Sequence, residues 1–178
     1  YLFAHNEPKE AKRILYKALN LLILLSLPCI AGILVTSKYL VPMFFGQDFA
    51  PSAKVLDVLT IFAVVNPFSQ LIINAYMIPI KKRSVANWMT IFVAALDVVI
   101  AIPLTKYYGA VGAATALAVV QVVLFLLLAK YSNKFIEWKK VFARYLPKPL
   151  DATLIMVIVV IGLMLLFGTS LVSMIIFI

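Results

Sequence analysis

Long apolar runs alternate with short polar segments along this chain, and each run is about as long as a membrane-spanning helix. The runs cover residues 18–36, 55–78, 85–105, 110–129 and 152–167. At about 1.5 Å per helical residue, roughly 20 residues cross the 30 Å hydrocarbon core of a bilayer. Lipid offers no hydrogen-bond partner to the backbone, so each run must be helical. The pattern predicts an all-α, polytopic transmembrane helical bundle of five spans.

The composition supports a membrane environment for the whole chain. Apolar residues make up 65% of the sequence, against about 45–50% in ordinary soluble domains, and the mean hydropathy is +1.08. We divide the chain into a cytoplasmic helical lead-in (1–17), a four-span core (18–130), a cytoplasmic amphipathic segment (131–150) and a final part (151–178). The final part holds the fifth span and, after a turn at Gly168-Thr169-Ser170, the start of a truncated sixth helix. The sequence begins without Met and ends in an apolar stretch, so we expect a longer chain.

Positive charges are distributed unevenly between the loops. The segments before the first span, between the second and third, and between the fourth and fifth hold 13 of the 16 Lys and Arg residues. The two other loops hold the remaining three. Basic loops stay on the cytoplasmic side, so we expect a multi-pass protein of the cell membrane whose first residue lies on the cytoplasmic side. The net charge of +9 therefore reflects topology and attraction to anionic lipid, and we expect no nucleic-acid partner.

Three amides recur every four residues in the second run. Asn66, Gln70 and Asn74 fall on one face of a helix, drifting only about 40° per step. One interpretation is a face that lines a lumen or contacts a substrate. The other is a set of hydrogen bonds between neighbouring helices.

The third and fourth runs also carry polar residues. Asp97 is the one acid deep within an apolar run, where an ionised carboxylate must be neutralised, paired or hydrated. Together with Asn87 it belongs to a stripe of small and polar side chains. Asp97 is either a cation or proton site in a hydrophilic lumen, or a protonated group bonded to a neighbouring helix. Gln121, on a face of small residues in the fourth run, is a further candidate for the lumen.

The sequence lacks the usual signatures of catalysis. It contains no phosphate-binding Walker loop, no His-Glu-x-x-His metal motif and no Ser/His/Asp set. His5 is the single histidine and Cys29 the single cysteine, so we assign neither a metal site nor a redox role. We expect a protein that is not an enzyme and holds no cofactor.

Several stretches resemble polysaccharide biosynthesis proteins of the oligosaccharide flippase type, in the multidrug/oligosaccharidyl-lipid/polysaccharide exporter superfamily. The similarity covers roughly residues 10–135. Its best markers are Phe45-Gly46-Gln47-Asp48-Phe49 after the first run and Tyr108-Gly109-Ala110-Val111-Gly112 at the start of the fourth. Further matching stretches are Leu27-Pro28 and Asn66-Pro67-Phe68.

The resemblance implies two helical bundles around a central cavity, of which this chain supplies most of the second. Such proteins move a polyprenyl-phosphate-linked oligosaccharide across the cytoplasmic membrane by alternating access without ATP. The phosphate would then contact Lys54, Lys82 or Arg83, or cations of the missing first bundle. The family commonly has Asn at the positions of Asp97 and Ala101, and this chain departs from that pattern.

Two other functions compete with a flippase. A cation-coupled drug or metabolite exporter of the same superfamily would use Asp97 for its coupling ion. A non-transporting membrane scaffold would bury the polar stripes between helices and leave no cavity.

Overall fold

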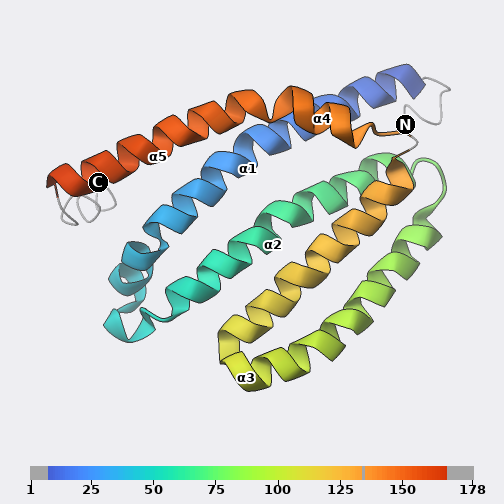
Figure 1. Cartoon of the computed structure of the whole chain (residues 1–178). Coiled ribbons are helices and arrows are strands. Elements are labelled where there is room, and N and C mark those ends of the chain that lie inside the picture. Colours follow the sequence, from blue (N-terminus) through green and yellow to red (C-terminus); the bar gives the residue numbers. More distant parts are fainter. Residues whose placement is uncertain (1–7, 134, 168–178) are drawn as a thin grey trace.

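The computed structural model describes residues 8–133 and 135–167, and its elements are helices (Figure 1). The described residues contain no strand, which confirms the all-α class. In chain order the elements are α1 (Pro8–Phe45), η1 (Gln47–Phe49), α2 (Ser52–Ile72), η2 (Ile73–Met77), α3 (Arg83–Ser132), α4 (Trp138–Tyr145) and α5 (Pro147–Phe167). The first seven residues of the predicted lead-in, including His5, and the turn at 168–170 lie outside the described residues.

Helix α1 is longer than its apolar run predicts. The first apolar run ends at residue 36, but the helix continues to Phe45, and the connection to α2 consists of Gly46, η1 and two further residues. Pro42 stands inside the helix without ending it, since the flanking residues remain apolar and helical. Gly46, with φ of 91°, then reverses the chain, a conformation that glycine adopts at little cost.

Helix α2 lies between α1 and α3 and continues into η2, a single π-helical segment (Figure 1). A short turn follows, in which Lys81 adopts a left-handed φ of 58° and its backbone N–H donates to the carbonyl of Ile78. The turn brings the chain back along α2 as α3. It matches the tight basic turn predicted between the second and third runs.

Helix α3 is a hairpin, because it folds back on itself at Gly109 (Figure 1). Gly109 has a φ of 59° and ψ of −137°, which divides the element into an outgoing half (83–108) and a returning half (110–132). The third run ends at residue 105 and the fourth begins at 110, yet helix extends to Tyr108 and one glycine makes the bend. The third and fourth apolar runs thus form the two halves of this hairpin.

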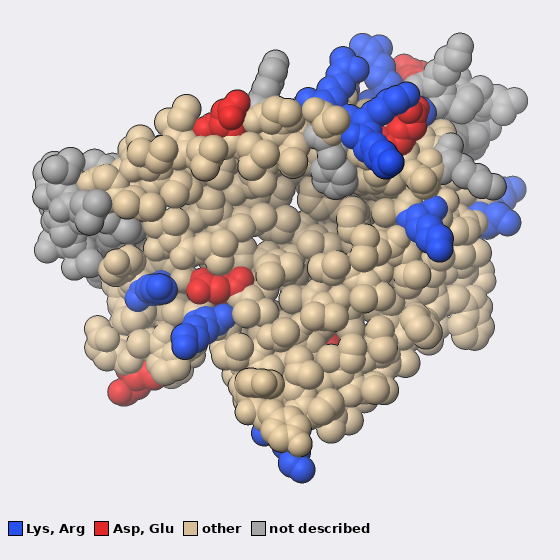
Figure 2. All heavy atoms as spheres, viewed as in Figure 1, with Lys and Arg blue, Asp and Glu red and all other residues tan. Residues whose placement is uncertain are grey.

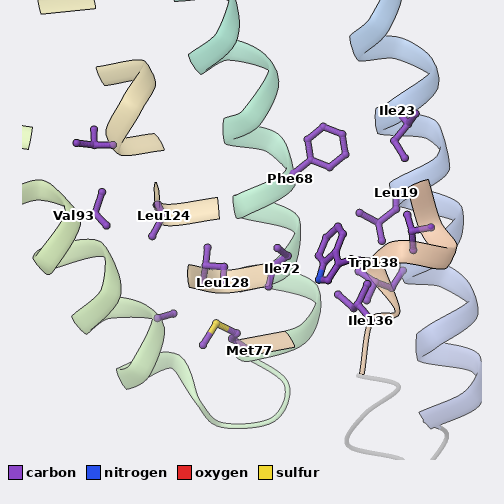
Figure 3. Packing of buried hydrophobic residues seen from close by; sticks show 14 residues of the cluster. Leu19, Ile23, Phe68, Ile72, Met77, Val93, Leu124, Leu128, Ile136 and Trp138 are labelled. Carbon is purple, nitrogen blue, oxygen red and sulfur yellow. The ribbon is translucent and has the colours of Figure 1, made fainter. Parts of the chain in front are cut away.

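The apolar core gathers at one end of the bundle (Figure 3). Its members come from α1, from α2 with η2, from both halves of α3, from the α3–α4 connection and from α4; they include Leu19, Ile23, Phe68, Ile72, Met77, Val93, Leu124, Leu128, Ile136 and Trp138. The indole of Trp138 lies between α1 and α2 in Figure 3. Its ring meets Phe125 edge-on at 5.4 Å between centroids.

The segment after α3 packs into the protein. We predicted an amphipathic helix over residues 131–150 lying on the inner leaflet. The observed helix α4 is shorter, and Ile136, Trp138 and Val141 are buried in the core instead of exposed to lipid. The Trp138 Nε1–H donates to the Ala129 carbonyl at 3.1 Å, which anchors the connection on the end of α3.

Helix α5 begins earlier than the sequence indicates. The fifth apolar run starts at residue 152, but Pro147 is the first residue of α5, and Asp151 is exposed within the first turns. Proline fits the start of a helix because its missing N–H is unbonded there in any case. Helix α5 packs on α1.

Among the described residues, three helices are long and apolar enough to cross a membrane: Lys12–Phe45, Ser52–Met77 and Arg83–Ser132. The pair Trp138–Tyr145 and Pro149–Gly162, bent by 45°, meets the same test when taken together. These lengths are consistent with a multi-pass membrane protein.

Charged side chains concentrate at the ends of the helices, and the surface between them is mostly apolar (Figure 2). The start of α1, the η2–α3 turn and the α3–α4 connection lie at one end, which we call the basic end (Figure 1). Element η1 and Gly109 lie at the opposite end. The loops that the sequence analysis found rich in Lys and Arg therefore share one end of the bundle.

Candidate functional site

A buried polar cluster joins α2 to the returning half of α3. The Gln121 side-chain Nε2–H donates to the Ser69 hydroxyl at 3.1 Å and to the side-chain oxygen Oδ1 of Asn66 at 3.5 Å. Ser69 is fully buried and Gln121 is 7% exposed. Two of the six predicted lumen residues, Asn66 and Gln121, therefore hold helices together, because an amide in an apolar setting needs a partner.

The other two amides of α2 point away from this cluster. Gln70 and Asn74 are exposed, on the same side of the helix and one turn apart. They lie about 10 Å and 5 Å from the Met77 end, at a rise of about 1.5 Å per residue. Polar side chains at that depth are costly against lipid, so this face requires water, another helix or a polar ligand.

Asp97 lies in the outgoing half of α3, partly covered. Its Oδ1 atom is buried and accepts no hydrogen bond from any residue that the structure describes. A buried carboxylate oxygen without a donor is unfavourable, so the group takes a proton, a cation or a donor from outside the described residues. Asn87, on the same half, is exposed. Within the described residues, no hydrogen bond or ion pair links either side chain to the Gln121 cluster.

The structure separates the three candidate phosphate ligands. Lys82 and Arg83 are exposed at the basic end, whereas Lys54 is exposed at the other end of α2. About 26 residues of helix, or roughly 39 Å, lie between them, so they cannot share one site. Lys54 forms no ion pair with Asp57, one turn further along α2, in the described part of the chain. One Asp57 carboxyl oxygen is buried and accepts no hydrogen bond from a described residue.

Sequence reasoning missed Ser69, although it completes the buried cluster. Ser69 is three residues from Asn66, the spacing of neighbours on a helix face, but a lone serine in an apolar run carries little signal. The sequence also gave no indication of a groove of about 180 Å³ between α1 and α2, where Cys29 and Thr60 are among the lining residues. Among the described residues no group of three His, Cys, Asp or Glu side chains could hold a metal ion.

Comparison with known proteins identifies no relative. The chain matches no protein-family model, no curated protein and no solved structure. The function must therefore be argued from the residues themselves.

Proposed function

We propose that this chain is part of a membrane transporter that moves a lipid-linked oligosaccharide across the cytoplasmic membrane by ATP-independent alternating access. In this proposal the two halves of α3, together with α1, α2 and α5, each cross the bilayer, giving five spans. The basic end faces the cytoplasm, since Lys and Arg are retained on that side. A further helical bundle of the same protein would close the cavity.

The observation that carries the proposal is the exposed amide face of α2. Gln70 and Asn74 are exposed on a 26-residue segment, Ser52–Met77, that is long and apolar enough to cross a membrane. Amide groups donate and accept hydrogen bonds, which suits the hydroxyl groups of a sugar. A scaffold that buried all its polar groups between its own helices would not leave these two exposed.

Asp97 favours a second candidate, a cation-coupled exporter. Its Oδ1 atom is buried and accepts no hydrogen bond from the described residues, so it can take up a proton or coordinate a monovalent cation. Substitution by Asn removes the charge and keeps the shape. If Asp97 binds the coupling ion, a folded Asp97→Asn variant loses gradient-driven transport. Undiminished transport by that variant would eliminate this role.

The proposal is tested by following the leaflet in which lipid-linked sugar resides. In cells that lack the full-length gene, we expect the sugar to stay in the cytoplasmic leaflet, closed to an impermeant periodate or lectin probe. The wild-type gene should restore outer accessibility. The double variant Gln70→Ala/Asn74→Ala should restore it at least about tenfold more slowly, the loss expected for two polar contacts. Normal leaflet distribution without the gene would refute the proposal.

A further inference from the structure

A second hollow lies between α1 and the α4–α5 bend, apart from the amide face. Its volume is about 460 Å³, and its lining consists of Asn20, Leu24, Arg144, Tyr145 and Pro149. This volume falls within the roughly 300–1,000 Å³ typical of small-molecule sites. Both walls belong to elements that pack on one another, since α1 contacts α4 and α5. The hollow is therefore part of the folded chain.

The hollow has a cation at its rim. The Arg144 guanidinium is exposed, lies 6.0 Å from the centre of the Tyr145 ring, and forms no ion pair with any acid that the structure describes. A guanidinium can give two parallel hydrogen bonds to a phosphate. Arg144 is thus free to bind an anion at the basic end.

Helix α1 adds polar groups to the same rim. Lys17 and Asn20 are both exposed and one turn apart, so they lie on one face of the helix. The nearest acid of α5, Asp151, follows Pro149 by two residues and therefore projects about 200° away around that helix. The field at the rim is consequently positive, which favours an anionic ligand.

The deeper part of the hollow is apolar. Leu24 is one turn past Asn20 along α1, and Pro149 is buried just inside α5. A cationic rim followed by an apolar floor matches an amphiphile that has an anionic head.

We propose that this hollow binds one anionic membrane phospholipid. The Arg144 guanidinium and the Asn20 amide would contact the phosphate, Lys17 would add positive potential, and an acyl chain would lie along Leu24 and Pro149. The site differs from the proposed transport path in location and in ligand, and it does not depend on transport being correct. A bound lipid would hold the α4–α5 bend against α1.

The test counts lipids on the intact chain. The purified protein in a non-ionic detergent is titrated with phosphatidylglycerol, and bound lipid is measured by native mass spectrometry. The Arg144→Gln variant should bind the first lipid about tenfold more weakly, the loss of one charge-assisted contact. Lys139→Gln removes the same charge from another face of α4, about 140° away, and should change affinity less than twofold. Arg144→Lys should fall between wild type and Arg144→Gln.

Two outcomes would overturn the proposal. Equal weakening by Arg144→Gln and Lys139→Gln would show that diffuse charge, and no defined site, retains the lipid. Equal affinity for inorganic phosphate and for phosphatidylglycerol would show that the apolar floor contributes nothing and that the ligand is a free anion. Circular dichroism of each variant checks that the helices are intact, and Arg144 is exposed, so its replacement leaves no cavity in the core.

Discussion

Gly112 in the returning half of α3 packs directly against the backbone carbonyl of Leu104 in the outgoing half. A Cβ atom added at Gly112 would collide with that carbonyl oxygen and carbon, and both belong to rigid helical backbone. The hairpin can close at Gly109 only because the residue one turn later has no side chain. The close approach holds the two halves of α3 against each other next to the bend.

We predict that Gly112→Ala opens or distorts the hairpin. Since the obstructing atoms are backbone, the cost should reach at least about 1–3 kcal/mol, the range for overpacked sites. Gly32→Ala is the matched control, because a Cβ there meets nothing within 4 Å and alanine is the better helix former. Thermal unfolding in detergent should show a lower Tm for Gly112→Ala and an equal or higher Tm for Gly32→Ala. Equal melting of both variants would mean that the two halves do not approach this closely.

Trp138 anchors the α3–α4 connection, and we predict that Trp138→Phe weakens it. Phenylalanine keeps most of the ring but loses the Nε1–H bonds to the Ala129 carbonyl at 3.1 Å and the Ser132 hydroxyl at 3.3 Å. The expected loss of stability is about 1–2 kcal/mol. Trp88→Phe is the control, because Trp88 is 69% exposed, and it should leave the unfolding midpoint unchanged. If the two variants behaved alike, the anchoring role would be wrong.

Some of this arrangement could be predicted from the sequence and some could not. Apolar runs and the basic-loop pattern indicate long helices with alternating direction, because both are local properties. The burial of Trp138 is not a local property. A tryptophan among lysines fits a helix on the membrane surface as well as a buried one, and Trp138 is buried because its indole fills the space between α1 and α2. Similarly, Asn66 and Gln121 are 55 residues apart in sequence, so the hydrogen bond between their side chains could not be predicted from a local pattern. The break between the third and fourth runs indicates a bend near Gly109, but the packing of Gly112 on Leu104 is a contact between two helical segments that the runs alone do not report.

Glu137 gives the basic end a pH dependence. The hydrogen bond from Lys140 and its charge, aided by the charge of Lys12 at 3.6 Å, hold the pKa of Glu137 below its ordinary value of 4.5. A lowered folded-state pKa stabilises the fold above the unfolded value, and this stabilisation is lost as the pH falls through the folded value. Conversely, Glu137 raises the pKa of Lys140, so the contribution of Lys140 is lost only at strongly alkaline pH.

We therefore predict that the midpoint of thermal unfolding falls between about pH 5 and pH 3, and that Glu137→Gln reduces this fall. The effect should be small because the side chain is largely exposed, and 1 M NaCl should weaken it further. The measurement is a series of melts of wild type and Glu137→Gln over that range. An identical acid dependence in both proteins would exclude Glu137 as a contributor.

Two glutamines should respond in opposite ways to substitution by leucine. Gln121→Leu leaves the Ser69 hydroxyl and the Asn66 amide without their buried partner, so we expect a loss of about 0.5–2 kcal/mol in stability. Gln70→Leu removes an exposed amide that forms no hydrogen bond with any described residue, and should leave stability unchanged while impairing transport. Stability and sugar translocation are measured on the same two variants. A stable but transport-defective Gln121→Leu protein would reverse these assignments.

The central claim is that the amide face of α2 borders a hydrated cavity within the membrane, and aqueous access to Gln70 tests it most directly. Single cysteines are placed at Gln70 and at Ile61 in a Cys29→Ala background, which removes the only native thiol. Ile61 is 49% exposed. It is nine residues from Gln70 and therefore on the opposite face of α2. Its distance from the Ser52 end is similar to the distance of Gln70 from the Met77 end. In intact membranes a charged, impermeant maleimide should label the cysteine at position 70 and spare the one at position 61. Labelling of neither position, or of both equally, would contradict a cavity on the amide face.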